Sequence, residues 1–323
     1  MRTISAAREV RRAARLAPRG GLSTGRMRRG KGWRELRTAL PFMLPGFLLV
    51  IFFVLWPLVR GIQMSLYDWN LMVPEQSVFV GAHNLVRALT DSSFWVATRN
   101  TFLYAAVTVP AQMALGLAAA VMLNAHVRGK VLFRTLYYLP VVTSWLVVSF
   151  VFQFLFTDGL GPVNYLLVDV LHVTDEPIAW LHQTWTAQVP IMVLGIWKGI
   201  GWNMVIFLAA LATMPIELMD AAAVDGASGW ERFRYVTLPL LKPTVLFVSV
   251  VLTIGAFNVF LSVYLLTGGG PERSTEVMLT YMYNQAFRFL DFGYGVTIGL
   301  LLGVAVIVLG FLQRRFFRGA VEY

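Results

Sequence analysis

The amino-acid sequence predicts an all-α polytopic membrane protein. Of its 323 residues, 57% are hydrophobic and only 14% are charged, whereas an ordinary soluble domain is about a quarter charged. Apolar runs of about 20 residues recur along the chain, which is the length that a helix needs to cross a bilayer. A soluble helical bundle is disfavoured, because such runs have no polar face to present to water.

Six apolar segments are expected to span the membrane as helices. They cover roughly residues 40–61, 100–124, 137–156, 187–212, 245–266 and 294–312. Basic residues without acids lie in the 125–136 loop, and Arg314, Arg315 and Arg318 follow the last span, whereas the 157–186 loop holds acids and no base. The positive-inside rule therefore places both termini and the 125–136 and 213–244 loops in the cytoplasm. The loops at 62–99, 157–186 and 267–293 then face outward.

The positive charge of the chain is concentrated at its N-terminus. Residues 1–38 hold twelve Lys and Arg against two acids, while the rest holds fifteen of each sign. We expect a disordered basic tail that stays in the cytoplasm beside anionic lipid and fixes topology, a role favoured over binding to nucleic acid. Residues 39–318 are expected to form one membrane domain, and residues 319–323 a short C-terminal tail.

Several kinds of chemistry find no support in the sequence. The chain has no cysteine, which excludes disulfides, thiolate metal sites and cysteine nucleophiles. Its histidines, His83, His126, His172 and His182, show no metal-ligand spacing. No phosphate-binding G-x-x-x-x-G-K-[ST] motif occurs, so the chain itself is not expected to bind ATP. We therefore predict no catalytic residue, metal or cofactor in this chain.

The 213–244 loop is predicted to contain a helical hairpin. Thr213 is expected to cap a first helix over residues 216–224, with Pro215 in its first turn and a run of alanines from Ala221. Gly226 is expected to end this helix with a positive φ.

A second short helix is predicted to follow the glycine. Ser228 and Glu231 form an S-x-x-E capping box, and the helix is expected to end near Val236, before Leu238-Pro239. The hairpin exposes small residues and Phe233 among charges. It therefore either packs against its own membrane helices or offers a docking surface to another protein.

The loop resembles the segment that defines permease subunits of bacterial ATP-binding-cassette importers. That segment follows the pattern E-A-A-x-x-D-G-A and then x-L-P-x-x-x-P, and here residues 220–227 and 238–243 read DAAAVDGA and LPLLKP. The one departure is Asp220, where glutamate is usual. Further stretches, including "RTLYYLPVV", "IWKGIGWNMVIFLAAL" and "YLLTGGGPERSTE", are similar to the carbohydrate-importing branch and to the first of its two permease subunits. The resemblance runs from about Leu40 to the C-terminus.

The resemblance implies a type I importer permease in a bacterial cytoplasmic membrane. Its expected partners are a second permease subunit, two ATP-binding subunits that hold ATP and Mg, and an extracytoplasmic sugar-binding protein. The hairpin would then couple ATP hydrolysis in the partner to movement of the spans. The residues expected to form this coupling loop are Asp220, Ala221, Ala222, Asp225, Gly226, Ala227, Phe233 and Pro239.

Polar and small residues within the spans are candidates for a substrate pathway, since polar groups in membrane segments usually face a cavity or the protein interior. Aromatic faces and amides together suit a carbohydrate. The glycines are equally compatible with helix packing, and the lysine with a structural partner or with snorkelling. The candidates are Ser144, Trp145, Gly195, Lys198, Gly199, Trp202, Asn203, Asn258 and Ser262.

Two other functions fit the sequence less well than an importer subunit does. An ion-coupled secondary transporter would typically carry carboxylates within its spans, but the acids here lie almost entirely in loops. A membrane-embedded sugar or lipid enzyme would need an acidic or histidine cluster at the membrane face. The sequence does not specify the sugar.

Overall fold

A computed structural model describes residues 29–125, 128–159 and 161–317. Most of the expected basic tail, His126 and the short C-terminal tail lie outside these ranges. Helix α2 (Arg29–Val50) begins within the segment that was expected to form the tail. The chain divides into two units after Leu58, and each is described by itself.

The first unit is helical in its described part. It contains α2, the π-helical turn η1 (Ile51–Leu55) and the start of α3 (Trp56–Ser65). Residues Thr38–Ser65 form one of the helical stretches that are long and apolar enough to cross a membrane. This stretch corresponds to the first expected span.

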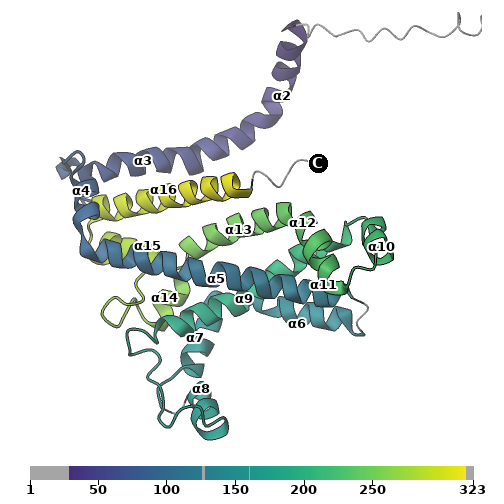
Figure 1. The fold of residues 1–323 in the computed structure, drawn as a ribbon. Coiled ribbons are helices and arrows are strands. Elements are labelled where there is room, and N and C mark those ends of the chain that lie inside the picture. Colours follow the sequence, from purple (N-terminus) through teal and green to yellow (C-terminus); the bar gives the residue numbers. More distant parts are fainter. Residues whose placement is uncertain (1–28, 126–127, 160, 318–323) are drawn as a thin grey trace, which may run out of the picture. The chain divides into compact units, whose positions relative to one another are not determined.

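The second unit is built on four long apolar helices, α5 (Ser92–Asn124), α9 (Gln188–Ala212), α13 (Lys242–Phe257) and α16 (Phe292–Phe317). Helix α13 continues after a short interruption at Asn258 into α14 (Leu261–Leu266), and the two count as one candidate span. Figure 1 shows α5, α6 and α9 side by side, with α13 against α5. The described residues thus contain five candidate spans, or six if one bent pair is included.

The third expected span is not a continuous helix. Residues 137–156 fall instead in α6 (Lys130–Val142) and α7 (Trp145–Leu155), which meet at 96°. Thr143 and Ser144 between them have extended backbones, with ψ of 148° and 133°.

Short elements occupy the connections between the long helices. A two-stranded antiparallel pair, β1 (Tyr67–Asp68) and β2 (Val78–Phe79), lies before α4 (His83–Thr90). The remaining connections hold η2 (Pro74–Gln76), α8 (Pro162–Tyr165), η3 (Leu166–Val170), α10 (Ile216–Val224), α11 (Gly229–Arg232), η4 (Phe233–Thr237), α12 (Leu238–Leu240), α15 (Met278–Tyr283) and η5 (Asn284–Arg288).

Two apolar clusters form the core of the second unit. One surrounds Phe257 and Tyr294, and the other surrounds Phe207 and Leu241 near the end that carries α10 and α11. Most other apolar side chains of the long helices are exposed or only partly buried. This distribution is what a bilayer requires, because lipid solvates the outer apolar faces as well as the protein interior does.

A polar cluster around Asp91 joins α4, α5, α15 and α16 at the opposite end of the unit. The Asp91 carboxylate caps α5 by accepting from Ser93 N at 2.8 Å, and it also accepts from the Tyr281 and Tyr294 hydroxyls. Burial alone would raise the pKa of the Asp91 carboxyl, but the tyrosine hydroxyls and the Ser93 N–H outweigh burial and hold the pKa below its ordinary value of 3.8.

The lowered pKa of Asp91 predicts an acid-dependent loss of stability. A carboxyl with a lower pKa in the folded state stabilises fully above its unfolded-state pKa, and this contribution is lost as pH falls through the folded-state pKa. Asp91→Asn keeps a capping side chain but not the charge, and we expect it to cost about 1–3 kcal/mol near neutral pH.

The measurement is the melting temperature of the full chain in detergent between about pH 3 and pH 7. The difference in melting temperature between wild type and Asp91→Asn should disappear at the acid end of this range. Asp175→Asn, at an exposed position in the 157–186 loop, serves as the control and should leave the melting temperature unchanged. A gap that is constant over the whole pH range would rule out this role for the Asp91 charge.

Candidate functional site

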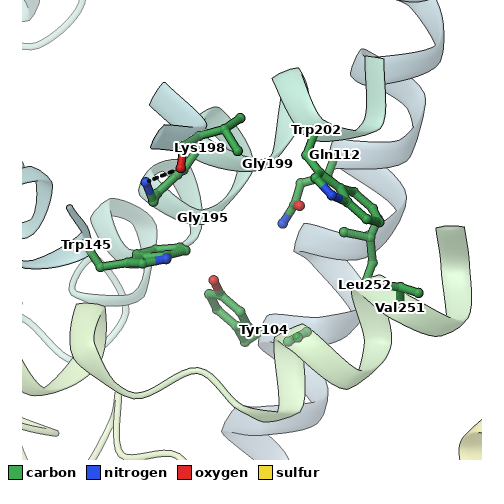
Figure 2. A pocket seen from close by; sticks show the side chains of 12 residues that line it. Tyr104, Gln112, Trp145, Gly195, Lys198, Gly199, Trp202, Val251 and Leu252 are labelled. Carbon is green, nitrogen blue, oxygen red and sulfur yellow. Dashed lines mark hydrogen bonds between the residues drawn. The ribbon is translucent and has the colours of Figure 1, made fainter. Parts of the chain in front are cut away.

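A cavity of about 270 Å³ lies between α5, α9, α13 and the break between α6 and α7. Figure 2 shows the tyrosine, glutamine and tryptophan side chains around this space. Five of the pathway candidates predicted from the sequence line this cavity: Trp145, Gly195, Lys198, Gly199 and Trp202. The other lining residues are Tyr104, Gln112, Val141, Val251, Leu252, Gly255 and Ala256.

Lys198 is buried at the cavity wall, with 4% of its surface exposed. Its Nζ donates to the carbonyl oxygens of Pro140 and Thr143, both at 2.6 Å, and lies 5.0 Å from the centre of the Trp145 ring. These carbonyls belong to the broken end of α6, where no following helical turn supplies N–H donors. The sequence left open whether Lys198 has a structural partner or snorkels to the membrane surface. In the structure it has structural partners, the carbonyl groups of Pro140 and Thr143.

The glycine pair on α9 makes room for side chains from α5. A Cβ on Gly195 would collide with the Tyr104 hydroxyl, and a Cβ on Gly199 would collide with the Gln112 side-chain amide. These glycines therefore serve close helix packing, and the atoms packed against them are polar.

Tyr104 and Gln112 are cavity residues that sequence reasoning missed. Both point into the cavity in Figure 2, and neither the hydroxyl nor the amide has a hydrogen-bond partner within the described residues. They share one face of α5, with Thr108 midway between them at helical spacing. This row of polar residues in an otherwise apolar span is the sequence feature that could have identified Tyr104 and Gln112 as cavity residues.

The remaining pathway candidates do not line this cavity. Ser144 is the exposed N-cap of α7, and Asn258 donates to Ile254 O at the end of α13. Asn203 and Ser262 are buried, and each keeps a side-chain oxygen without a partner among the described residues. Asn203 uses its amide nitrogen to donate to Gly199 O at 2.9 Å.

The predicted hairpin is present, with a correction at its start. Helix α10 covers Ile216–Val224 as expected, but Pro215 occupies its N-cap position. The Thr213 hydroxyl instead donates to Ala210 O at 2.8 Å, at the end of α9. Thr213 therefore ends the preceding helix, because only two residues separate it from α10 and its side chain faces back along α9.

The turn after α10 depends on Gly226, which has a φ of +82°. The N–H groups of Gly226 and Ala227 donate to Ala223 O and Ala222 O at 3.1 and 3.0 Å. This is the Schellman pattern, in which a left-handed residue closes the helix end. An added Cβ on Gly226 would meet no atom within 4 Å, so this position faces open space.

The second helix starts with the predicted capping box. Glu231 N donates to the Ser228 hydroxyl at 3.3 Å, and Ser228 N donates to the Glu231 carboxylate at 2.7 Å. The expected end near Val236 is wrong, because α11 continues through the π-helical η4 and then α12 to Leu240. Pro239 lies within this continuation, as the second residue of α12, and does not end it.

Half of the eight predicted coupling residues lie on the open side of the hairpin. Asp220, Ala221, Asp225 and Gly226 are exposed, and the neighbouring Val224 is 87% exposed. Ala222, Ala227 and Pro239 are partly buried. Phe233 faces inward and lines a second cavity of about 640 Å³ between the hairpin and the ends of α5 and α9.

The fold and the two sites define a class: a helical membrane protein with a cavity between its spans and an exposed helical hairpin at one end. The family model "Binding-protein-dependent transport system inner membrane component" matches residues 112–321. This chain belongs to that family, whose members are permease subunits and not enzymes.

Characterised relatives and a solved structure agree with this assignment. The chain is 38% identical over 277 residues to the lactose transport system permease protein LacF of Rhizobium radiobacter, covering 84% of this chain and 91% of the relative. It is 32% identical to the arabinooligosaccharides transport system permease protein AraP of Halalkalibacterium halodurans, covering 85% and 86%.

A chain of a bacterial ABC transporter for import of the acidic polysaccharide alginate superposes with a TM-score of 0.77. The two are 20% identical, and the match covers 90% of this chain and all of the other. The fold is therefore that of an ABC importer permease.

The close approach of α9 to α6 generates a prediction about two glycines. A Cβ on Gly201 would collide with the backbone carbonyl of Tyr137, whereas a Cβ on Gly255, at the cavity wall, would meet nothing within 4 Å. We expect Gly201→Ala to lower the free energy of unfolding by about 1–3 kcal/mol. Gly255→Ala is the matched control and should be neutral or slightly stabilising. Melting temperatures in detergent measure both, and equal shifts would contradict the close contact.

Proposed function

We propose that this chain is one of two permease subunits in an ATP-driven, binding-protein-dependent importer of carbohydrates. The observation that carries the proposal is that one helix, α9, forms a wall of the cavity and leads directly into the exposed hairpin. The family supplies the transport role, and the relatives named for lactose and arabinooligosaccharides support a carbohydrate as substrate.

The cavity has the chemistry that carbohydrate binding requires. The rings of Trp145 and Trp202 provide flat apolar surface for the C–H faces of a sugar, and the Tyr104 hydroxyl and Gln112 amide provide neutral donors and acceptors for its hydroxyl groups. Tyr104 and Gln112 make no competing hydrogen bond within the described residues, so both are available to a ligand.

The hairpin has the features of a docking lever. Its first helix is exposed, and only residues 213–215 separate it from α9. A helix transmits axial and rotational movement along its length because its backbone is hydrogen-bonded throughout. Movement of α10 by an ATPase would therefore reach the cavity wall at Gly199 and Lys198.

The remaining partners and the topology follow from the same proposal. We place both termini and the hairpin in the cytoplasm of a bacterial cell, with the chain crossing the cytoplasmic membrane several times. Two ATP-binding subunits would hold ATP and Mg, a second permease would complete the pathway, and an extracytoplasmic protein would deliver the sugar. A solved alginate ABC transporter in complex with a pentasaccharide-bound periplasmic protein supports this last partner. No nucleic acid is involved.

The docking role of the hairpin is tested by Gly226→Trp. The substituted position has a positive φ and open surroundings, so the new ring would project outward and block a docking partner. Gly159→Trp is the control, because Gly159 also has a positive φ and open surroundings but lies in the 157–186 loop. We expect the wild type and Gly159→Trp to co-purify with an ATPase from native membranes in mild detergent. Gly226→Trp should retain less than about a tenth of that ATPase, a loss of at least 1.4 kcal/mol in binding.

Two results would contradict the proposal at different levels. If the wild type brings down no ATPase, the importer assignment fails. If Gly226→Trp retains the ATPase as well as Gly159→Trp does, α10 is not the docking element.

A further inference from the structure

We infer that the pathway cavity is built for an uncharged sugar and that Lys198 is a positioning residue, not a ligand for an anionic substrate. The inference rests on the proposed function, because it takes the cavity to be the substrate site. It concerns the charge class of the substrate, which the family does not specify.

The hydrogen-bonding capacity of Lys198 is already used within the protein. An ammonium group has three N–H donors. Two of them are directed at Pro140 O and Thr143 O at 2.6 Å, and the third has Val141 O at 3.4 Å and the Thr143 hydroxyl at 3.5 Å within reach. Two of the three donors are thus committed to short bonds within the protein, and the third already has acceptors at the same helix end.

The charge of Lys198 is also partly compensated. Its acceptors are the last carbonyls of α6, where a helix carries a negative partial charge of about half an electron. The face of the Trp145 ring, 5.0 Å away, adds a second region of negative potential. The lysine thus completes the helix end that the α6–α7 break exposes, and it holds Trp145 at the cavity wall.

The rest of the cavity offers nothing that would bind an anion. Among the residues that the structure describes, Lys198 is the only charged one lining it. The remaining polar side-chain groups, at Tyr104, Gln112, Trp145 and Trp202, are neutral. An anionic sugar would lose the hydration of its charge without gaining a direct ionic partner, which is costly in a membrane interior. A neutral sugar would lose only hydroxyl hydration, which these groups replace.

The absence of cysteine from the chain permits a direct test of the cavity's electrostatic potential. Val251→Cys places one thiol at the cavity wall. In the assembled importer in membranes, this thiol is labelled with 2-sulfonatoethyl or 2-(trimethylammonio)ethyl methanethiosulfonate, and labelling of this chain is followed by mass spectrometry. The ratio of anionic to cationic labelling rates is then compared with and without Lys198→Met.

We expect the rate ratio to change by less than about threefold, because a compensated charge contributes little to the cavity potential. A fall of roughly tenfold or more on Lys198→Met would show that the lysine presents its charge to solutes, and would overturn the inference. Failure of both charged reagents and of neutral methyl methanethiosulfonate to label the wild-type cavity would also overturn it, because such a cavity admits no solute. The ATPase co-purification test does not depend on either result, so the two proposals can fail separately.

The positioning role has its own readout. Neutral methyl methanethiosulfonate reports access to Val251→Cys without an electrostatic contribution. We expect Lys198→Met to change this rate several-fold as Trp145 and the α6 end relax, and Lys198→Arg to restore it, since arginine also donates several hydrogen bonds. Equal rates in all three backgrounds would show that Lys198 does not hold the cavity wall.

Discussion

The carbonyl groups freed at the break between α6 and α7 are the constraint on which the rest of the membrane domain depends. In hydrocarbon, every backbone polar group must find its partner inside the protein. The 96° bend at Thr143 removes the helical donors that would have served the end of α6. Lys198 replaces them from α9, and Gly201 lets the α6 backbone at Tyr137 approach closely enough for this to happen. The bend, α9 and the cavity therefore form one structural unit.

The local chemistry of the hairpin explains why it could be predicted in such detail. The bounds of α10, the positive φ of Gly226 and the capping box of Ser228 each follow from residues within a few positions of one another. The exceptions are Thr213, whose hydroxyl bonds back to Ala210 instead of capping α10, and the second helix, which continues through Pro239 to Leu240.

The break in the third span could not be predicted from its own sequence. Pro110 and Pro140 both lie in apolar runs, yet α5 continues through Pro110 to Asn124 while α6 ends just after Pro140. Prolines are tolerated in membrane helices where neighbours satisfy the freed groups, so a proline alone does not specify a bend. What distinguishes the two is a tertiary partner, Lys198, which lies more than fifty residues away in the chain.

Only some of the cavity residues could be predicted from the sequence. The glycines of α9 could be recognised as positions that allow a neighbour to approach closely. The side chains that pack against them, Tyr104 and Gln112, come from α5 and were not predicted. The polar groups offered to a substrate are thus carried by α5, and the hairpin is attached to α9. Any movement that the hairpin imposes on α9 relative to α5 must alter the contacts of Gly195 with Tyr104 and of Gly199 with Gln112. Coupling and substrate binding would then meet at these two contacts, because glycine leaves no side chain to absorb the displacement.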